Sequence, residues 1–315
     1  MIITVNESTI GELFFSLPEP EELTKAEEQI SDICRSALND EESSRLEYEL
    51  EQMKKTKTAF HFLVLKEIYD FSKEQGHAIV LKGNSAGSII SYLLGISPIN
   101  PNELPFISPE LIWESHRKFY IPDFEINISA DIRPLIQKKL DERFGFIKSD
   151  DNLFYNIRMT DVTFWDKISG AEINIKNFDL DMCTAVMQEL FPAQKNVSCN
   201  FEQLINVYAY DAGAFINEIS SEKLLSADVI VTRDQLYTAL ISNSVPKELA
   251  IEVVKKGVWS NKLKKEEYLL SLEKYSLPES VIYAFNNAKH LWDAVSCISR
   301  LCVICQSKYE SVIES

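Results

Sequence analysis

Three oxygen-bearing side chains alternate with apolar ones in the segment Ile121-Pro-Asp-Phe-Glu-Ile-Asn127. The surrounding residues, Phe119–Ile128, favour a β-strand, and a strand would point Asp123, Glu125 and Asn127 to one face. Neighbours on that face lie about 6.6 Å apart along the strand. Two carboxylates at this spacing can share a pair of divalent metal ions, as in-line phosphoryl or nucleotidyl transfer requires. The alternative is a half-exposed strand whose polar residues face water.

A second segment, Lys82-Gly-Asn-Ser-Ala-Gly-Ser88, precedes an apolar run that is expected to form a core helix over Ser85–Leu94. Backbone N–H groups at a helix start, together with nearby serine hydroxyls, can bind phosphate oxygens. The alternative is a simple N-cap by Asn84 or Ser85. The predicted nucleotide-binding residues are Lys82, Gly83, Asn84, Ser85, Gly87 and Ser88.

The elements that would position these residues give an α+β chain. Helical spacing of apolar residues predicts a helix over Ala59–Phe71, which Gly76 ends before a buried strand at Ala78–Leu81. A further strand is expected at Ala171–Leu180, so that a mixed half ends near residue 182. Helices are expected beyond it near 181–190, 201–208, 234–241, 247–256, 264–275 and 279–306.

Composition restricts the classes of partner. The 315 residues carry a formal charge of −16, so most of the surface would repel the phosphate backbone of DNA, and any DNA contact needs a local lysine patch. The longest apolar stretches, such as Ile89–Ile96, are too short to cross a bilayer. Six scattered cysteines indicate a reducing compartment. These features predict a cytoplasmic protein with no membrane partner.

For two further groups of residues a structural role is favoured over a functional one. Cys297, Cys302 and Cys305 lie at helical spacing among apolar residues, which favours buried thiols over a metal site. The four histidines are isolated in sequence, and no Ser/His or Cys/His arrangement indicates hydrolytic catalysis.

Taken in order, the segments resemble the catalytic core of the bacterial replicative DNA polymerase III alpha subunit, the C family, in its common and Gram-positive forms. The order is the basis of the resemblance, which extends over about residues 40–306. Residues 45–55, 61–65 and 73–76 resemble the segment that leads into the palm, 84–101 the phosphate loop with its helix, and 121–127 the metal strand. Residues 162–167 and 171–181 resemble the stretch that ends in the strand with the third metal carboxylate. Residues 201–205, 246–257 and 277–283 resemble the fingers helices.

The resemblance implies a nucleotidyltransferase-like palm with a mixed sheet at 45–181, containing a reduced thumb at about 145–161. An acidic helical extension at 1–44 would precede it, and an α-rich fingers-like domain at 182–315 would follow. Such a palm transfers a deoxynucleoside triphosphate to a DNA primer with two Mg²⁺ ions. The resemblance places Asp123, Glu125 and Asp179 as metal ligands, and a replication protein is a further partner to test.

The motifs also depart from the family pattern. Lys82-Gly-Asn84 stands where the family shows Gly-Arg-Gly, and Glu125 replaces an aspartate with a side chain one methylene longer. The fingers lysine and histidine correspond to Ala294 and Ser296. These changes predict a weakly active or inactive DNA polymerase III alpha-like protein. The alternative is a pseudoenzyme, or an acidic protein–protein interaction module, that binds nucleotide, DNA or a replication partner without catalysis.

Overall fold

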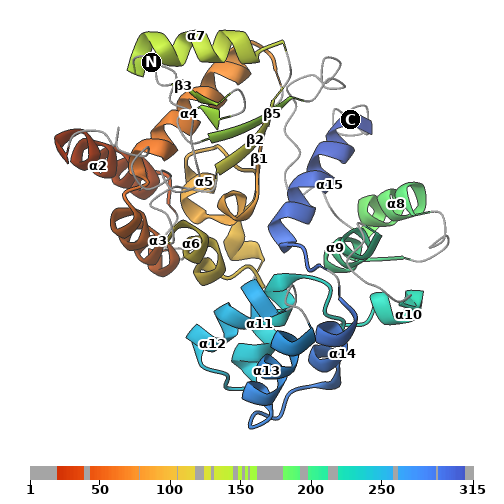
Figure 1. Ribbon diagram of the computed structural model, residues 1–315. Helices are drawn as coiled ribbons and strands as arrows, with labels where there is room; N and C mark the ends of the chain where they lie inside the picture. The colour runs from red at the N-terminus through yellow and green to blue at the C-terminus, as the bar shows by residue number, and fades with distance from the viewer. Residues whose placement is uncertain are drawn as a thin grey trace. The chain divides into compact units, whose positions relative to one another are not determined.

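The computed structural model describes most of the chain between residues 20 and 308 (Figure 1). The described residues are 20–38, 43–77, 79–104, 106–117, 124–128, 131–144, 148–150, 153–154, 157–161, 180–191, 198–211, 219–257, 262–288 and 290–308. The chain divides into two compact units. Unit 1 contains 1–105, 109–175 and 302–315, and unit 2 contains 106–108 and 176–301. The sequence boundary was expected near residue 182.

Unit 1 contains a five-stranded mixed sheet in the order β1-β2-β5-β4-β3. The strands are β1 (Ile79–Lys82), β2 (Phe124–Ile128), β3 (Lys148–Asp150), β4 (Leu153–Phe154) and β5 (Ile157–Asp161). β2 pairs antiparallel with β1 and parallel with β5, and the other two pairings are antiparallel. The α+β class and the strand expected before Gly83 are therefore confirmed.

The segment expected to be a reduced thumb, about 145–161, supplies strands β3, β4 and β5 to this sheet. The segment joins the sheet because β2 lies inside it, and the backbone groups on both edges of β2 need hydrogen-bonding partners. β1 satisfies one edge and β5 the other. The strand expected at Ala171–Leu180 lies outside the described residues except for Leu180, which begins a helix.

Helix α4 (Ala59–Glu74) packs on β1 and contributes to the core of unit 1 (Figure 1). The ring of Phe62 meets Phe124 edge-on at a centroid distance of 4.9 Å, and the centroid of the Trp113 ring lies 6.1 Å from that of Phe62. In β2, Phe124, Ile126 and Ile128 are buried while Asn127 is only partly buried. The alternation predicted for this strand is confirmed over the side chains that are described.

The other helices of unit 1 surround this core. They are α2 (Pro20–Ser36), α3 (Ser43–Thr56), α5 (Ile89–Leu93), α6 (Pro109–Arg117) and α7 (Arg133–Phe144), with 3-10 turns at Asn84–Gly87 and Pro101–Glu103. α2 packs against α3, α4 and α5 through Ala26, Ile30 and Cys34, which recur every fourth residue and are buried. Residues 20–36, which lie in the segment expected as an N-terminal extension, thus pack within unit 1.

The regular secondary structure of unit 2, where it is described, is helical apart from one isolated β-bridge. Its helices are α8 (Leu180–Leu190), α9 (Phe201–Ala209), α10 (Ser221–Leu224), α11 (Arg233–Ser242), α12 (Lys247–Glu252) with a π-helical continuation at Val253–Gly257, α13 (Lys262–Leu272), α14 (Glu279–Asn287) and the first part of α15 (Ala294–Lys308). The α-rich second half is confirmed.

The single helix expected over 279–306 is wrong, because α14 ends at Asn287 and α15 begins at Ala294. Long-range contacts account for the break. Trp292 forms a β-bridge with Thr232, and its carbonyl accepts a hydrogen bond from the Arg233 N–H at 2.9 Å. The Asp234 carboxylate then accepts the Ala294 N–H at 2.7 Å, which fixes the start of α15.

No helix in the described part of the chain is both long and apolar enough to cross a membrane. The described cysteines are buried and form no disulfide bond with one another, and the buried positions of Cys297 and Cys302 confirm their interpretation as core thiols. The side chain of Cys305 lies outside the described residues.

The buried His61 predicts a pH dependence of stability. Burial lowers its pKa from 6.5 to about 4, so the unfolded chain binds the proton more tightly than the folded one. The free energy of unfolding should therefore fall as the pH drops below 6.5, by about 2 kcal/mol between pH 7 and pH 5. Urea unfolding of wild type and His61→Leu at both pH values measures this, because leucine does not titrate. An equal change in both proteins would contradict the prediction.

The tight packing of Gly257 gives a second prediction. A Cβ at this position would lie 2.8 Å from Cζ of Phe285, whose ring is fully buried. Gly257→Ala should lower the free energy of unfolding by about 1–3 kcal/mol, since the buried Phe285 ring would have to shift within a packed core. In a double-mutant cycle with Phe285→Leu the alanine should cost less, because the shorter side chain removes the clash. Additive effects of the two substitutions would show that the close approach is not the cause.

Candidate functional site

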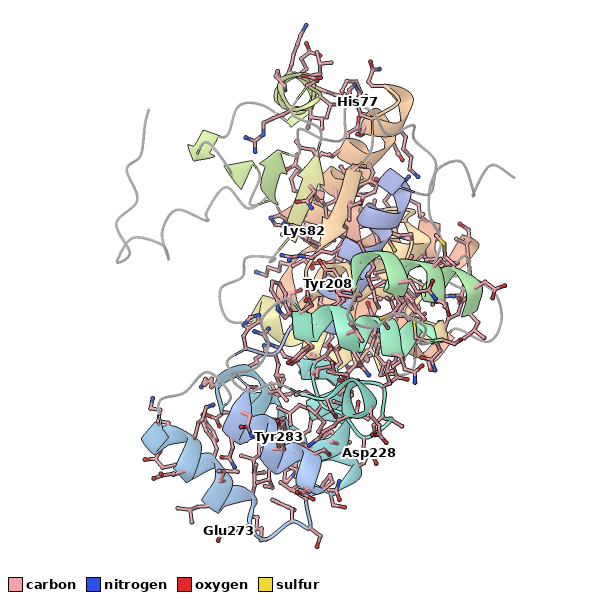
Figure 2. The ribbon with its side chains drawn as sticks, turned by 90° about the vertical axis from the view of Figure 1, so that its right-hand side faces the viewer. His77, Lys82, Tyr208, Asp228, Glu273 and Tyr283 are labelled. Atoms are coloured by element: carbon pink, nitrogen blue, oxygen red, sulfur yellow. The ribbon has the colours of Figure 1, made fainter. Side chains whose placement is uncertain are left out.

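The predicted phosphate loop connects β1 to α5 in unit 1. Lys82, labelled in Figure 2, is the last residue of β1, and Gly83 follows with φ at +69°, a conformation that favours glycine. Asn84 opens a 3-10 turn that ends at Gly87. The core helix expected over Ser85–Leu94 is therefore interrupted, and α5 begins only at Ile89 with Ser88 as its N-cap.

The start of α5 is occupied by a carboxylate of the protein itself. Glu49, on α3, accepts the Ile89 N–H at 3.1 Å and the hydroxyl of Ser88. The Ser88 oxygen in turn accepts the Ile90 N–H at 3.2 Å. Arg45, one turn before Glu49, donates to its carboxylate at 2.9 Å. The Glu49 side chain is 0% exposed, so this is a buried ion pair at a helix start.

The backbone carbonyls of the turn are also satisfied internally. The Ser85 carbonyl accepts the hydroxyl of Ser91 at 2.7 Å, and the Ala86 carbonyl accepts that of Ser97 at 2.6 Å. Arg45 donates to the third carbonyl in the row, that of Gly87, at 3.1 Å. Side chains from three different segments therefore fix the shape of the loop.

This network divides the predicted nucleotide-binding residues into two groups. Ser85, Gly87 and Ser88 are buried. Lys82, Gly83 and Asn84 are partly exposed. The N-cap of α5 is Ser88, where Asn84 or Ser85 was expected. Phosphate binding by these residues stays a prediction, and Ser88 could take part only by exchanging Glu49 for a phosphate oxygen.

The carboxylate strand lies next to this loop in the sheet. The pairing of β1 with β2 sets Lys82 opposite Glu125, and the pairing of β2 with β5 sets Arg158 opposite the same residue. Residues directly opposite one another in a sheet share a face and lie close together. The register therefore places the position of one predicted metal ligand between the positions of two basic residues.

Asn127 is the one polar residue of the strand whose side chain is described. Its Oδ1 atom is buried and accepts no hydrogen bond from any described residue. An unsatisfied buried carbonyl oxygen is costly and suits a cation or a donor. Asp123 and Asp179 lie outside the described residues, as does the side chain of Glu125. Among the side chains that are described, no three His, Cys, Asp or Glu residues cluster as a metal site.

The two altered fingers positions lie at the start of α15 in unit 2. Ala294 is buried and its N–H is bound by Asp234, and Ser296 is partly exposed. Burial and the nearby Asp293 carboxylate raise the pKa of Asp234 to about 7, while the bond from Ala294 acts in the opposite direction. Sequence reasoning missed Asp234, as it missed the role of Glu49, because neither shows a local motif.

Substitution of Glu49 tests how far the loop depends on it. Glu49→Ala leaves the Arg45 guanidinium without its carboxylate in a buried site and should lower the free energy of unfolding by about 3–5 kcal/mol. Glu49→Gln keeps an acceptor oxygen and should cost less. The matched control is Glu47→Ala, which breaks the exposed pair with Arg35 and should change stability little. Equal losses in the two alanine variants, measured by urea unfolding, would contradict this role.

Comparisons with known proteins agree with the motifs. The family described as the bacterial DNA polymerase III alpha NTPase domain matches residues 21–157. The DNA polymerase III subunit alpha of Bacillus subtilis is 27% identical over 143 residues, which cover 41% of this chain and 12% of that protein. The DNA polymerase III subunit alpha of Ureaplasma parvum is 23% identical over 231 residues, 66% of this chain and 21% of that protein.

An error-prone DNA polymerase of Bdellovibrio bacteriovorus is also similar, with 27% identity over 108 residues, 34% of this chain and 10% of that protein. The chain thus spans about a tenth to a fifth of the length of these relatives. The matched region contains the loop, the carboxylate strand and the helix that carries Glu49. The resemblance expected from the motifs is confirmed: this chain is similar to DNA polymerase III alpha subunits, and the family match lies in residues 21–157.

Proposed function

We propose that this chain is a replication-related protein whose palm-like site in unit 1 binds a deoxynucleoside triphosphate together with Mg²⁺ and retains weak nucleotidyl transfer at most. The observation that supports the proposal is the register of β1 and β2, which brings the loop residue Lys82 opposite Glu125 of the carboxylate strand. A cation beside a metal-binding carboxylate suits a ligand that carries both phosphates and a metal.

In this proposal Asp123 and Glu125 of unit 1 hold Mg²⁺, and the buried Oδ1 of Asn127 adds an oxygen of the type that Mg²⁺ prefers. Bound Mg²⁺ would neutralise charge on the triphosphate and polarise the phosphorus that is attacked. Lys82 and Arg158 would attract the anionic ligand, because both occupy positions next to Glu125 in the sheet. Gly83 and Asn84 are the loop residues that remain accessible to it.

The second candidate is a pseudoenzyme that binds the nucleotide and does not transfer it. Two observations favour weak or absent catalysis. Glu49 occupies the helix start at which the resemblance places a phosphate contact. Ala294 and Ser296 stand at the positions of the fingers lysine and histidine, so no cation at those two positions assists the leaving phosphate.

Nucleotide binding and primer extension separate these candidates. We expect wild type to bind deoxynucleoside triphosphates more tightly with Mg²⁺ than without it. Asp123→Asn should weaken the affinity measured with Mg²⁺ by at least about tenfold, because a carboxylate that binds the metal is removed. Isothermal titration calorimetry measures the binding. Extension of a primed template in Mg²⁺ and Mn²⁺, with Asp123→Asn as control, measures the transfer.

Extension by wild type that Asp123→Asn abolishes would identify a minimal polymerase. Mg²⁺-dependent binding without extension would identify a pseudoenzyme. A folded wild type with no Mg²⁺-dependent nucleotide affinity would overturn the proposal and leave a protein–protein interaction module.

A further inference from the structure

Two consecutive residues of α11 contact two consecutive residues at the start of α15 in a crossed arrangement. Arg233 pairs with Asp293, with 3.1 Å between Nη1 and the carboxylate. Asp234 binds the next residue along, because its carboxylate accepts the N–H of Ala294 at 2.7 Å. All four residues belong to unit 2. The arrangement joins the first turn of α11 directly to the start of α15.

The two carboxyl groups of this arrangement differ in their surroundings. The Asp293 side chain is 21% exposed and has the Arg233 guanidinium as its partner. Asp234 is 4% exposed and forms no ion pair with any described residue. A buried carboxylate without a cationic partner is costly, and a second negative charge nearby increases the cost. The site therefore favours the neutral acid form of Asp234.

The charged groups next to Asp234 act on its pKa in both directions. Burial and the Asp293 carboxylate raise this pKa from 3.8 to about 7. The N–H of Ala294 and the Arg233 guanidinium oppose the shift only in part. The folded site thus holds the proton more tightly than an aspartate in water does.

Other titratable groups near Asp234 add no buried positive charge. Cys297, one turn into α15, is a neutral thiol, because burial raises its pKa above the usual range. Burial, aided by Arg233, lowers the pKa of His290 from 6.5, so its imidazole is neutral at pH 7. On α9, α12 with its continuation, and α14, which contact α11, the charged side chains are partly or fully exposed and screened by solvent: Glu202, Lys247, Glu248, Glu252, Lys255, Lys256 and Glu279.

We propose that the contact of residues 233–234 with residues 293–294 is a proton-controlled clasp, closed while Asp234 carries a proton and opened more often once Asp234 loses it. Loss of the proton leaves a negative charge buried beside Asp293, and hydration of Asp234 in the open form relieves that charge. The ligand of the clasp is the proton, and the element it controls is the first turn of α15. The inference goes beyond the proposed function and does not depend on nucleotide binding in unit 1.

Linkage between proton binding and opening gives the direction of the effect. The Asp234 carboxyl has a pKa of about 7 in the closed form, and water restores the ordinary value of 3.8 in the open form. The proton therefore stabilises the closed clasp fully below about pH 4, and this stabilisation is lost as the pH rises to about 7. At higher pH both forms are ionised, and the effect levels off.

Hydrogen exchange of the backbone N–H groups at 294–298 tests the clasp in the full chain, after correction for the intrinsic exchange rate at each pH. In wild type the protection of these groups should fall by about 10- to 100-fold between pH 5 and pH 8. Asp234→Asn keeps an acceptor oxygen and cannot ionise, so it should remove this dependence. Asp228→Asn, which changes an exposed aspartate of unit 2 labelled in Figure 2, should retain it.

Carbon-13 labelling of the aspartate carboxyl groups gives a second readout, because it follows the protonation of Asp234 directly. In wild type this carboxyl, assigned through its backbone, should titrate at about pH 7. Asp293→Asn should move the titration to lower pH and reduce the fall in protection, because it removes the neighbouring charge and leaves Arg233 to act on Asp234.

Titration of Asp234 near its ordinary value would overturn the inference, and this measurement on wild type decides even where a variant does not fold. Equal pH dependence of protection in wild type and folded Asp234→Asn would also overturn it. So would an Asp293→Asn variant that lowers protection by the same factor at every pH, since the contact would then be structural only.

Discussion

The buried Glu49 carboxylate is the constraint on which the candidate site of unit 1 depends. It joins α3 to the first N–H groups of α5 and fixes the Arg45 guanidinium, which in turn binds a carbonyl of the loop. A carboxylate at a helix start is favourable because the exposed N–H groups carry partial positive charge. A buried charge is tolerated only when it is paired and hydrogen-bonded, and both conditions are met at Glu49. Side chains from outside the loop therefore stabilise its conformation.

In unit 2, Asp234 is the carboxylate that binds the N–H group at a helix start. It lies in the first turn of α11 and binds the N–H that begins α15, so that one carboxylate links two helix starts.

The contributions of Asp234 and His61 to stability change in opposite directions as the pH falls. The raised pKa of Asp234 means that the folded chain binds the proton more tightly, so its contribution to stability increases as the pH falls from 7 towards 4. The depressed pKa of His61 makes its contribution decrease below pH 6.5.

Local sequence patterns predicted what local physics determines. The alternation in 124–128 gave the buried face of β2 in advance, and Gly76 marked the end of α4, where its φ is +74°. The helices of unit 2 followed from apolar spacing. The break between α14 and α15 could not be predicted in this way, because it depends on contacts with Thr232 and Asp234 some 60 residues earlier. The assignment of 157–161 to the sheet likewise depends on the open edge of β2, which is visible only when the strands are assembled.

At the candidate site, too, the local motif does not reveal a long-range contact. The motif predicted a phosphate at Ser88 because serine and glycine precede an apolar helix, and nothing in that motif reveals that Glu49, 39 residues earlier, already binds the serine. A phosphate that displaced Glu49 would leave a carboxylate and a guanidinium to be rearranged within a packed core, at a cost on the order of 3–5 kcal/mol. One good phosphate contact returns about 1.5–3 kcal/mol, which does not offset that cost. A triphosphate at this loop is therefore expected to contact the accessible Lys82, Gly83 and Asn84 and to leave the Glu49 network intact. Any remaining phosphate contacts must then come from other parts of the chain.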